Sequence, residues 1–170
     1  MIDFERGRSR LRSAFKIMNK LDILATKAFD ALLVRMNGEQ HLKMENEPFL
    51  PLTIECIGLD VGTPYGAGKL YSLCHYYVQN GDLMQDPEMC FVVVDNRTES
   101  EQYTELLSIF PYMYKLAALG IYQESIIIVN NSLAKFNRRM QTEHTVFANQ
   151  WLRNIKSQGY ANSCDHEKTI

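Results

Sequence analysis

The stretch SLCHYYVQNGDLMQDPEMCFVVVD, residues 72–95, decides the fold class of this chain. Both of its ends are rich in Tyr, Val and Phe, a composition that is typical of β-strands. Between them, Asn80-Gly81-Asp82 supplies residues that tolerate a positive φ, and Asp86-Pro87 adds a second turn signal. The stretch therefore predicts two strands of an antiparallel sheet joined by a polar turn.

Alternation of apolar and polar residues predicts further strands on both sides of this stretch. The first two form a hairpin that turns at residues 46–48, and a Gly- and Pro-rich loop follows at residues 62–68. Residues 103–110 allow a short helix that Pro111 would end, and Asn130-Asn131 is expected to close the sheet region. The expected strands cover residues 42–45, 50–56, 70–78, 89–95 and 112–129.

Apolar residues at helical spacing predict one helix near each end of the chain. The first covers residues 10–37 and should break near residues 19–22, because an unbroken helix would be about 40 Å long. The second covers residues 142–157. The fold class is therefore α+β: a mostly antiparallel sheet of about six strands, flanked by an N-terminal and a C-terminal helix packed on one face. The residues that the second helix should bury are Val146, Phe147, Trp151, Leu152 and Ile155.

Length and composition predict one domain. A chain of 170 residues can bury a full core, and 46% hydrophobic with 22% charged residues is ordinary for a globular protein. The domain is expected to cover residues 1–170, with frayed ends at 1–9 and 162–170. The apolar runs are too short to cross a membrane.

The cysteines predict neither a metal site nor a redox motif. Their spacings of 18, 16 and 74 residues match no Cys-x-x-Cys pattern, so we expect free thiols that pack as small apolar side chains. Residues 1–12 lack the apolar segment of a secretory signal, which predicts a cytoplasmic location. No cofactor and no metal is expected. The cysteines are Cys56, Cys74, Cys90 and Cys164.

Charge is distributed unevenly along the chain, although the net charge is only −2. Residues 1–37 carry a net charge of +4, residues 38–131 of −9 and residues 132–170 of +3. If both helices pack on one sheet face, their basic sides form a surface for a phosphate backbone or an acidic partner. The alternative is an ordinary solvated helix face. The expected binding residues on this surface are Arg138, Arg139 and Arg153.

Asp82, Asp86 and Glu88 place three carboxylates close together at the polar turn. Carboxylate oxygens are ligands of hard cations, so this turn is a candidate binding site for a ligand or cation. The spacing differs from that of an EF-hand loop, however. The alternative is that Asp82 and Asp86 only form hydrogen bonds with the backbone of the turn.

His75, Glu55 and Tyr77 are candidates for a catalytic acid–base cluster. Alternation along the strand places Leu73, His75 and Tyr77 on one face. If the strand register brings Glu55 and a tyrosine such as Tyr77 or Tyr122 to His75, the three groups could transfer protons. The alternative is a histidine whose hydrogen bonds are purely structural.

Five short segments together resemble a known family: SLCHYY (72–77), QNGDLM (79–84), DPEM (86–89), LGIYQE (119–124) and NQWLRN (149–154). This is a family of uncharacterised bacterial proteins that are often encoded on conjugative transposons and related mobile elements. The resemblance covers roughly residues 38–160. It implies a setting near DNA or DNA-processing proteins, and it implies no activity.

Because the chain carries no catalytic motif, a non-enzymatic accessory protein of a mobile element is the leading expectation for its function. It would contact a nucleic acid or a protein through its basic helices. The alternative is a small enzyme or a ligand- or cation-binding domain with its site at residues 82–88, near His75. A homodimer through an exposed sheet edge is a third expectation.

Overall fold

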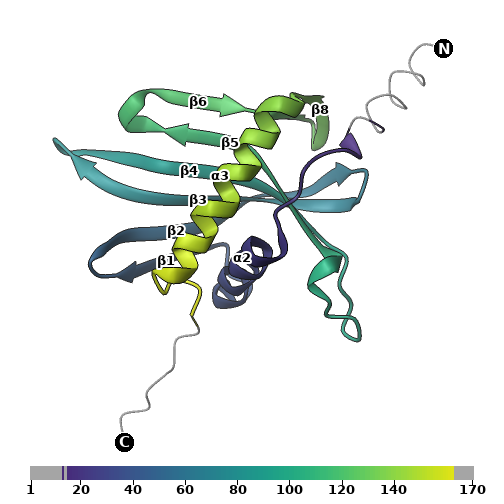
Figure 1. Cartoon of the computed structure of the whole chain (residues 1–170), viewed down its shortest axis with the longest axis horizontal. Helices are drawn as coiled ribbons and strands as arrows, with labels where there is room; N and C mark the ends of the chain where they lie inside the picture. The colour runs from purple at the N-terminus through teal and green to yellow at the C-terminus, as the bar shows by residue number, and fades with distance from the viewer. Residues whose placement is uncertain (1–12, 14, 163–170) are drawn as a thin grey trace, which may run out of the picture.

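The computed structural model describes residues 13 and 15–162, in which eight strands form one sheet (Figure 1). The strand order is β6-β5-β4-β3-β2-β8-β7, with β1 also paired to β2. The prediction of an α+β fold with a mostly antiparallel sheet is confirmed, while the expected number of six strands is too low. The strands are β1 (His41–Asn46), β2 (Phe49–Thr63), β3 (Gly66–Gln79), β4 (Asp82–Asp95), β5 (Leu107–Leu116), β6 (Ile121–Glu124), β7 (Ile126–Val129) and β8 (Ser132–Phe136).

The long strands β2, β3 and β4 form the centre of the sheet (Figure 1). Asn80 and Gly81 connect β3 to β4 with φ values of 53° and 88°, as the sequence predicts. Asp86-Pro87 is not a turn, because it lies inside β4 as a bulge in which two residues face the single residue His75. The expected loop at residues 62–68 is also mostly strand, and the chain turns at Pro64-Tyr65.

Strand β5 corrects the expectation of a short helix at residues 103–110. Only η1 (Thr104–Leu106) is helical there, and β5 then continues through Pro111. The register between β4 and β5 shifts next to Pro111, at Phe91. A bulge is one of the few places in a sheet where proline is tolerated, since proline has no backbone N–H to donate. A second short helical segment, η2 (Ala117–Leu119), leads to β6.

The hairpin of β7 and β8 continues the chain beyond the predicted end of the sheet. Asn130 and Asn131 both have positive φ values, 49° and 55°, and form its two-residue turn. The backbone N–H of Gly62 donates to the carbonyl oxygen of Asn131 at 2.8 Å, beside the parallel contact between β2 and β8. The Asn-Asn pair therefore reverses the chain into another strand instead of ending the sheet.

Helix α2 (Ile23–Met36) begins well after the predicted start at residue 10. Asp22 caps it by accepting a hydrogen bond from the backbone N–H of Ala25 at 2.9 Å. The predicted break near residues 19–22 is therefore confirmed. Asn37, with a φ of 48°, ends the helix as predicted. The first part of the expected helix and most of both expected frayed ends lie outside the described residues.

Helix α3 (Arg138–Ser157) begins four residues before its predicted start, because Asn137 provides the N-cap. The side chain of Asn137 accepts a hydrogen bond from the N–H of Met140 at 3.1 Å. Val146 and Phe147 were expected in the core, but they are 65% and 37% exposed. The expected core residues of this helix that are buried are Trp151, Leu152 and Ile155.

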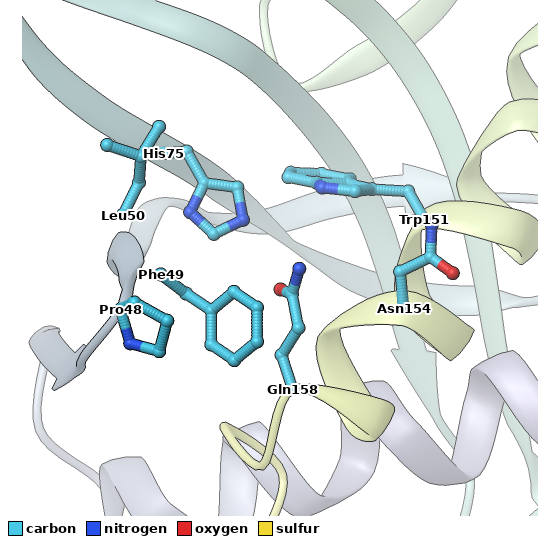
Figure 2. A pocket seen from close by; sticks show the side chains of 7 residues that line it. All are labelled: Pro48, Phe49, Leu50, His75, Trp151, Asn154 and Gln158. Carbon is cyan, nitrogen blue, oxygen red and sulfur yellow. The ribbon is translucent and has the colours of Figure 1, made fainter.

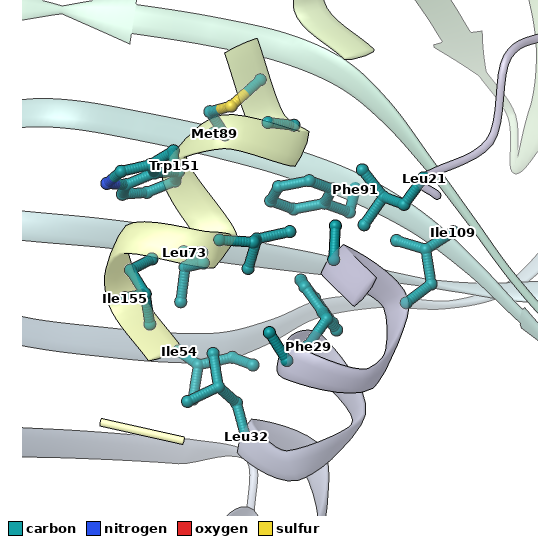
Figure 3. Close-up of a cluster of buried hydrophobic side chains, with 14 of the residues drawn as sticks. Leu21, Phe29, Leu32, Ile54, Leu73, Met89, Phe91, Ile109, Trp151 and Ile155 are labelled. Carbon is teal, nitrogen blue, oxygen red and sulfur yellow. The ribbon is translucent and has the colours of Figure 1, made fainter. Parts of the chain in front are cut away.

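Both helices contribute to one hydrophobic cluster with the sheet (Figure 3). Phe29 of α2 contacts Phe91 of β4 at a centroid distance of 4.9 Å, and Trp151 and Ile155 enter from α3. A second cluster lies on the other face of the sheet, where Phe15, Met18 and Ile126 cover β4 and β5. The sheet is thus covered on both faces, by helices on one and largely by the β7–β8 hairpin on the other.

Candidate functional site

A pocket of about 360 Å³ lies between the β1–β2 turn and the C-terminal half of α3 (Figure 2). This volume is at the lower end of the roughly 300–1,000 Å³ that small-molecule sites occupy. The β1–β2 hairpin, β3 and α3 each contribute to the lining. The lining residues are Pro48, Phe49, Leu50, His75, Trp151, Asn154 and Gln158.

Hydrogen bonds tie the two walls of the pocket together. The side chain of Asn46, at the end of β1, donates to the carbonyl oxygen of Gln158 after α3. The hydroxyl of Tyr160 donates to the carbonyl oxygen of Leu50, and Tyr160 is itself buried. Arg35 of α2 donates to the carbonyl oxygen of Tyr160 at 2.5 Å. The pocket is therefore held in shape by the fold, which lowers the entropy that a ligand must lose on binding.

His75 is the titratable side chain of this pocket and is only 8% exposed. Its Nδ1 lies 3.1 Å from the carbonyl oxygen of Pro51, and a carbonyl can only accept a hydrogen bond. Nδ1 therefore carries the hydrogen, and Nε2 faces the pocket toward Gln158 as an acceptor (Figure 2). Burial lowers the pKa of His75 below its ordinary value of 6.5, so the imidazole is neutral at pH 7.

The lining of the pocket offers hydrogen bonds without charge. Asn154 and Gln158 each carry an amide that both donates and accepts, and His75 adds an acceptor. Phe49 and Trp151 add aromatic surface, and Phe49 is 41% exposed at the mouth. A charged ligand group would lose its hydration here without gaining an opposite charge. The pocket therefore suits a neutral, flat group with polar edges.

The predicted acid–base cluster of His75, Glu55 and Tyr77 does not form. Leu52 is the cross-strand partner of His75 and packs under the helices, so His75 lies on the helix side of the sheet. Glu55 lies three residues further along β2 and points to the other face. Tyr77 shares the face of His75 but donates to the side chain of Gln79 near the hairpin end, at 3.4 Å.

The carboxylates of Asp82, Asp86 and Glu88 do not share a turn. Asp82 is exposed at the start of β4, and Asp86 lies in the bulge opposite His75. Glu88 lies on the opposite sheet face, where it accepts a hydrogen bond from the hydroxyl of Ser72 at 2.8 Å. Within the described part of the chain, no group of three or more His, Cys, Asp or Glu side chains is arranged to hold a metal ion.

Cys74 and Cys90 lie near Glu88 on the sheet face away from the helices. Both are buried, and burial raises the pKa of each thiol to about 12, with a further contribution from Glu88. They are therefore protonated at neutral pH, whereas a nucleophile or metal ligand must be a thiolate. The prediction of free, buried thiols is confirmed for these two residues, and Cys56 is a free thiol of intermediate exposure.

The three predicted arginines of α3 lie on its exposed side. Arg138 is the first residue of the helix, and Arg139 pairs with Glu143 at 3.2 Å while remaining 91% exposed. Arg153 pairs with Asp22, the N-cap residue of α2. Arg153 thus connects the two helices, whereas Arg138 and Arg139 project from the surface.

Charge is segregated between the helices and the strands. Helices α2 and α3 together carry six basic and two acidic side chains, a net charge of +4. The eight strands carry four basic and eight acidic side chains, a net charge of −4. Because both helices pack into one core cluster, their cations lie in one layer, which we call the helix layer.

Phe49, Asn154 and Gln158 carry no recognisable signal of a binding site in the sequence, and Trp151 is predicted there only as a core residue. The pocket joins positions about 100 residues apart, which a local pattern cannot reveal. The one usable signal is on α3, where Trp151, Asn154 and Gln158 follow at three- and four-residue spacing and so share a side of the helix.

Comparison with known proteins identifies the family of the chain. Among the described residues, no helix is long and apolar enough to cross a membrane. No curated protein and no solved structure matches the chain. A family described as a domain of unknown function (DUF6908) matches residues 27–161, which include every strand and α3. The expectation of an uncharacterised family is confirmed by this match: the chain belongs to the DUF6908 family.

Proposed function

We propose that this chain is a cytoplasmic, non-enzymatic accessory protein of a mobile element that binds nucleic acid through its helix layer. The observation that carries this proposal is the charge segregation, with +4 on the two helices against −4 on the strands. A basic layer attracts phosphates and releases their counterions, while the acidic sheet face repels them. Such a domain would bind in one orientation.

Exposed cations on both helices support the proposal. Lys27 on α2 and Arg138, Arg139 and Lys156 on α3 are all exposed. The resemblance of roughly residues 38–160 to proteins of conjugative transposons also supports it, because such proteins act near DNA. An acidic protein partner could use the same layer, but nothing in the fold favours it over a phosphate backbone.

The alternative of a small enzyme or cation-binding domain at residues 82–88 has less support. His75 and Glu55 lie on opposite faces of the sheet, and the carboxylates of Asp82 and Glu88 point to separate surroundings. General acid–base catalysis needs its groups within hydrogen-bonding reach of one substrate. The described residues offer no such arrangement around His75.

Fluorescence anisotropy of labelled single- and double-stranded DNA, titrated with the protein at two salt concentrations, tests the proposal. The test variant replaces the four exposed helix cations Lys27, Arg138, Arg139 and Lys156 with Gln. The control variant replaces the four lysines of the strands with Gln, so that both variants lose the same charge. Those control residues are Lys43, Lys69, Lys115 and Lys135.

We expect wild-type binding that weakens steeply with salt. In the helix variant the slope of log K against log salt should fall by roughly 0.7 for each lost contact to a single strand, or 0.9 to a duplex. The strand variant should keep the wild-type slope. An absence of binding at low salt, or an equal loss in both variants, would contradict a nucleic-acid-binding helix layer.

A further inference from the structure

The pocket beside His75 restricts the chemical class of its ligand. None of its seven lining side chains is charged, so it would exclude a phosphate, a carboxylate or an amine. It would accept a neutral group whose edge carries both donors and acceptors, because the amides of Asn154 and Gln158 offer both. A nucleobase has such an edge.

The aromatic residues of the pocket match the two faces of a base. Phe49 stands at the mouth on the β1–β2 turn, and Trp151 lies across the pocket from it on α3 (Figure 2). Proteins recognise unpaired bases by stacking on aromatic rings together with hydrogen bonds to the exposed edge. His75 Nε2 faces the same space as an acceptor, fixed by the bond from Nδ1 to Pro51.

The position of the pocket connects it to the helix layer. Helix α3 carries Trp151, Asn154 and Gln158 in the pocket and Arg139 and Lys156 on its exposed surface. A strand whose phosphates follow this helix could therefore turn one base into the pocket. In a duplex the base edges are paired and stacked, so they could not enter without being extruded.

We infer that this pocket binds one unpaired base, so that the domain prefers single-stranded over double-stranded nucleic acid. The inference rests on the proposed function and adds the part of the ligand that is read. It predicts that a free nucleoside, which carries no phosphate, binds to the pocket without help from the helix layer. The two proposals can therefore fail separately.

Trp151 is the single tryptophan of the chain and lines the pocket, so its fluorescence reports occupancy. The probes are adenosine, guanosine, cytidine and thymidine, titrated separately into the full chain, with excitation at the red edge of the tryptophan absorption. The test variants are Gln158→Ala and Phe49→Ala, both at positions with solvent access. Gln150→Ala is the control, an exposed glutamine of the same helix outside the pocket.

We expect a saturable change in fluorescence with at least one nucleoside. Either test variant should weaken that binding roughly tenfold, the loss expected when one stacking or anchoring group is removed. The control should bind like the wild type. No saturable change with any of the four nucleosides, or binding that both test variants leave intact, would overturn the inference.

Oligonucleotides separate the pocket from the helix layer. With the pocket variants, affinity for a single strand should fall while affinity for a duplex stays unchanged. If both affinities stay unchanged and still depend on salt and on the helix cations, the pocket inference is wrong and the proposed function stands. If nucleosides bind in the pocket but no oligonucleotide binds, the proposed function is wrong.

Discussion

Gln141 shows how one buried amide attaches the segment before α2 to α3. Its side chain is fully buried, and its Nε2 donates to the carbonyl oxygen of Asn19 at 2.7 Å. Its Oε1 accepts the backbone N–H of the same residue at 3.0 Å. The amide thus pairs with Asn19 as a neighbouring strand would, at a point where the chain has no such strand.

Replacing Gln141 with Leu should destabilise the fold, because both backbone groups of Asn19 lose their partner. The expected loss is about 1–3 kcal/mol in the free energy of unfolding. Urea denaturation measures it. Gln150→Leu makes the same change at an exposed position of α3 and should stay within about 0.5 kcal/mol of the wild type. Equal losses in the two variants would show that the pairing with Asn19 contributes little.

Residue-scale features were predictable where the cause is local. Asn37 and Asn80-Gly81 adopt positive φ, as their types favour, and both were predicted as chain reversals or helix ends. The partners of His75 were not predictable, since they come from the backbone of β2 and from α3. Alternation along β3 gives the face of His75 relative to its neighbours but not what covers that face.

Among the elements, α2 is attached to the end of β4 by Arg97. Its guanidinium donates two hydrogen bonds to Asp30 of α2, at 2.9 and 3.0 Å, and also bonds to Asp95 of β4. The Arg97 side chain is only 16% exposed. Hydrogen bonds from Arg97 hold the pKa of Asp95 below its ordinary value, so this network is strongest with both carboxylates ionised.

Arg97→Met should lower the free energy of unfolding by about 1–3 kcal/mol, because two carboxylates lose a charged, largely buried partner. Arg139→Met removes an exposed pair with Glu143 and should cost less than about 0.5 kcal/mol. Thermal unfolding at neutral pH measures both. Since the pKa of Asp95 is lowered, its contribution is present above the unfolded value near 4 and is lost as the pH falls further. A difference between the variants that survives at acid pH would contradict this account.

Two elements were mispredicted because one sequence signal has two structural meanings. Asn130-Asn131 was taken as the end of the sheet, yet a two-residue turn of this type equally starts the next strand, β8. Asp86-Pro87 was taken as a turn, yet proline also occurs at bulges inside strands. In both cases the deciding contacts are with β2 or β3, far away in the sequence.

The whole molecule should lose stability as the pH falls below neutrality. His75 and His144 are both buried, and loss of hydration lowers the pKa of each below 6.5. In the unfolded chain they take up protons near pH 6.5, while the folded chain resists protonation, so acid favours unfolding. The melting temperature should therefore fall between about pH 7.5 and pH 5.5.

Histidine variants test the origin of this pH dependence. The double variant His75→Gln and His144→Gln should show a flatter dependence of the melting temperature on pH. His41→Gln changes an exposed residue at the start of β1 and should keep the wild-type dependence. If the double variant keeps it as well, the buried histidines are not the cause.

The charge layout and the pocket differ in how far the sequence could predict them. The charge layout was predictable, because each cation belongs to a helix that periodicity already identifies. The pocket was not, because its walls meet only through contacts such as those of Asn46 with Gln158 and Tyr160 with Leu50. Neither contact has a sequence pattern that predicts it.

The most direct test of the central claim, that this domain reads nucleic acid with its helix layer, is a two-dimensional amide NMR titration with a single-stranded oligonucleotide. The account predicts that shift changes concentrate on the exposed residues of α2 and α3 and on the indole N–H of Trp151, the single tryptophan. Changes confined to the opposite face, around Glu55, Glu88 and Glu124, or no changes at low salt, would contradict it.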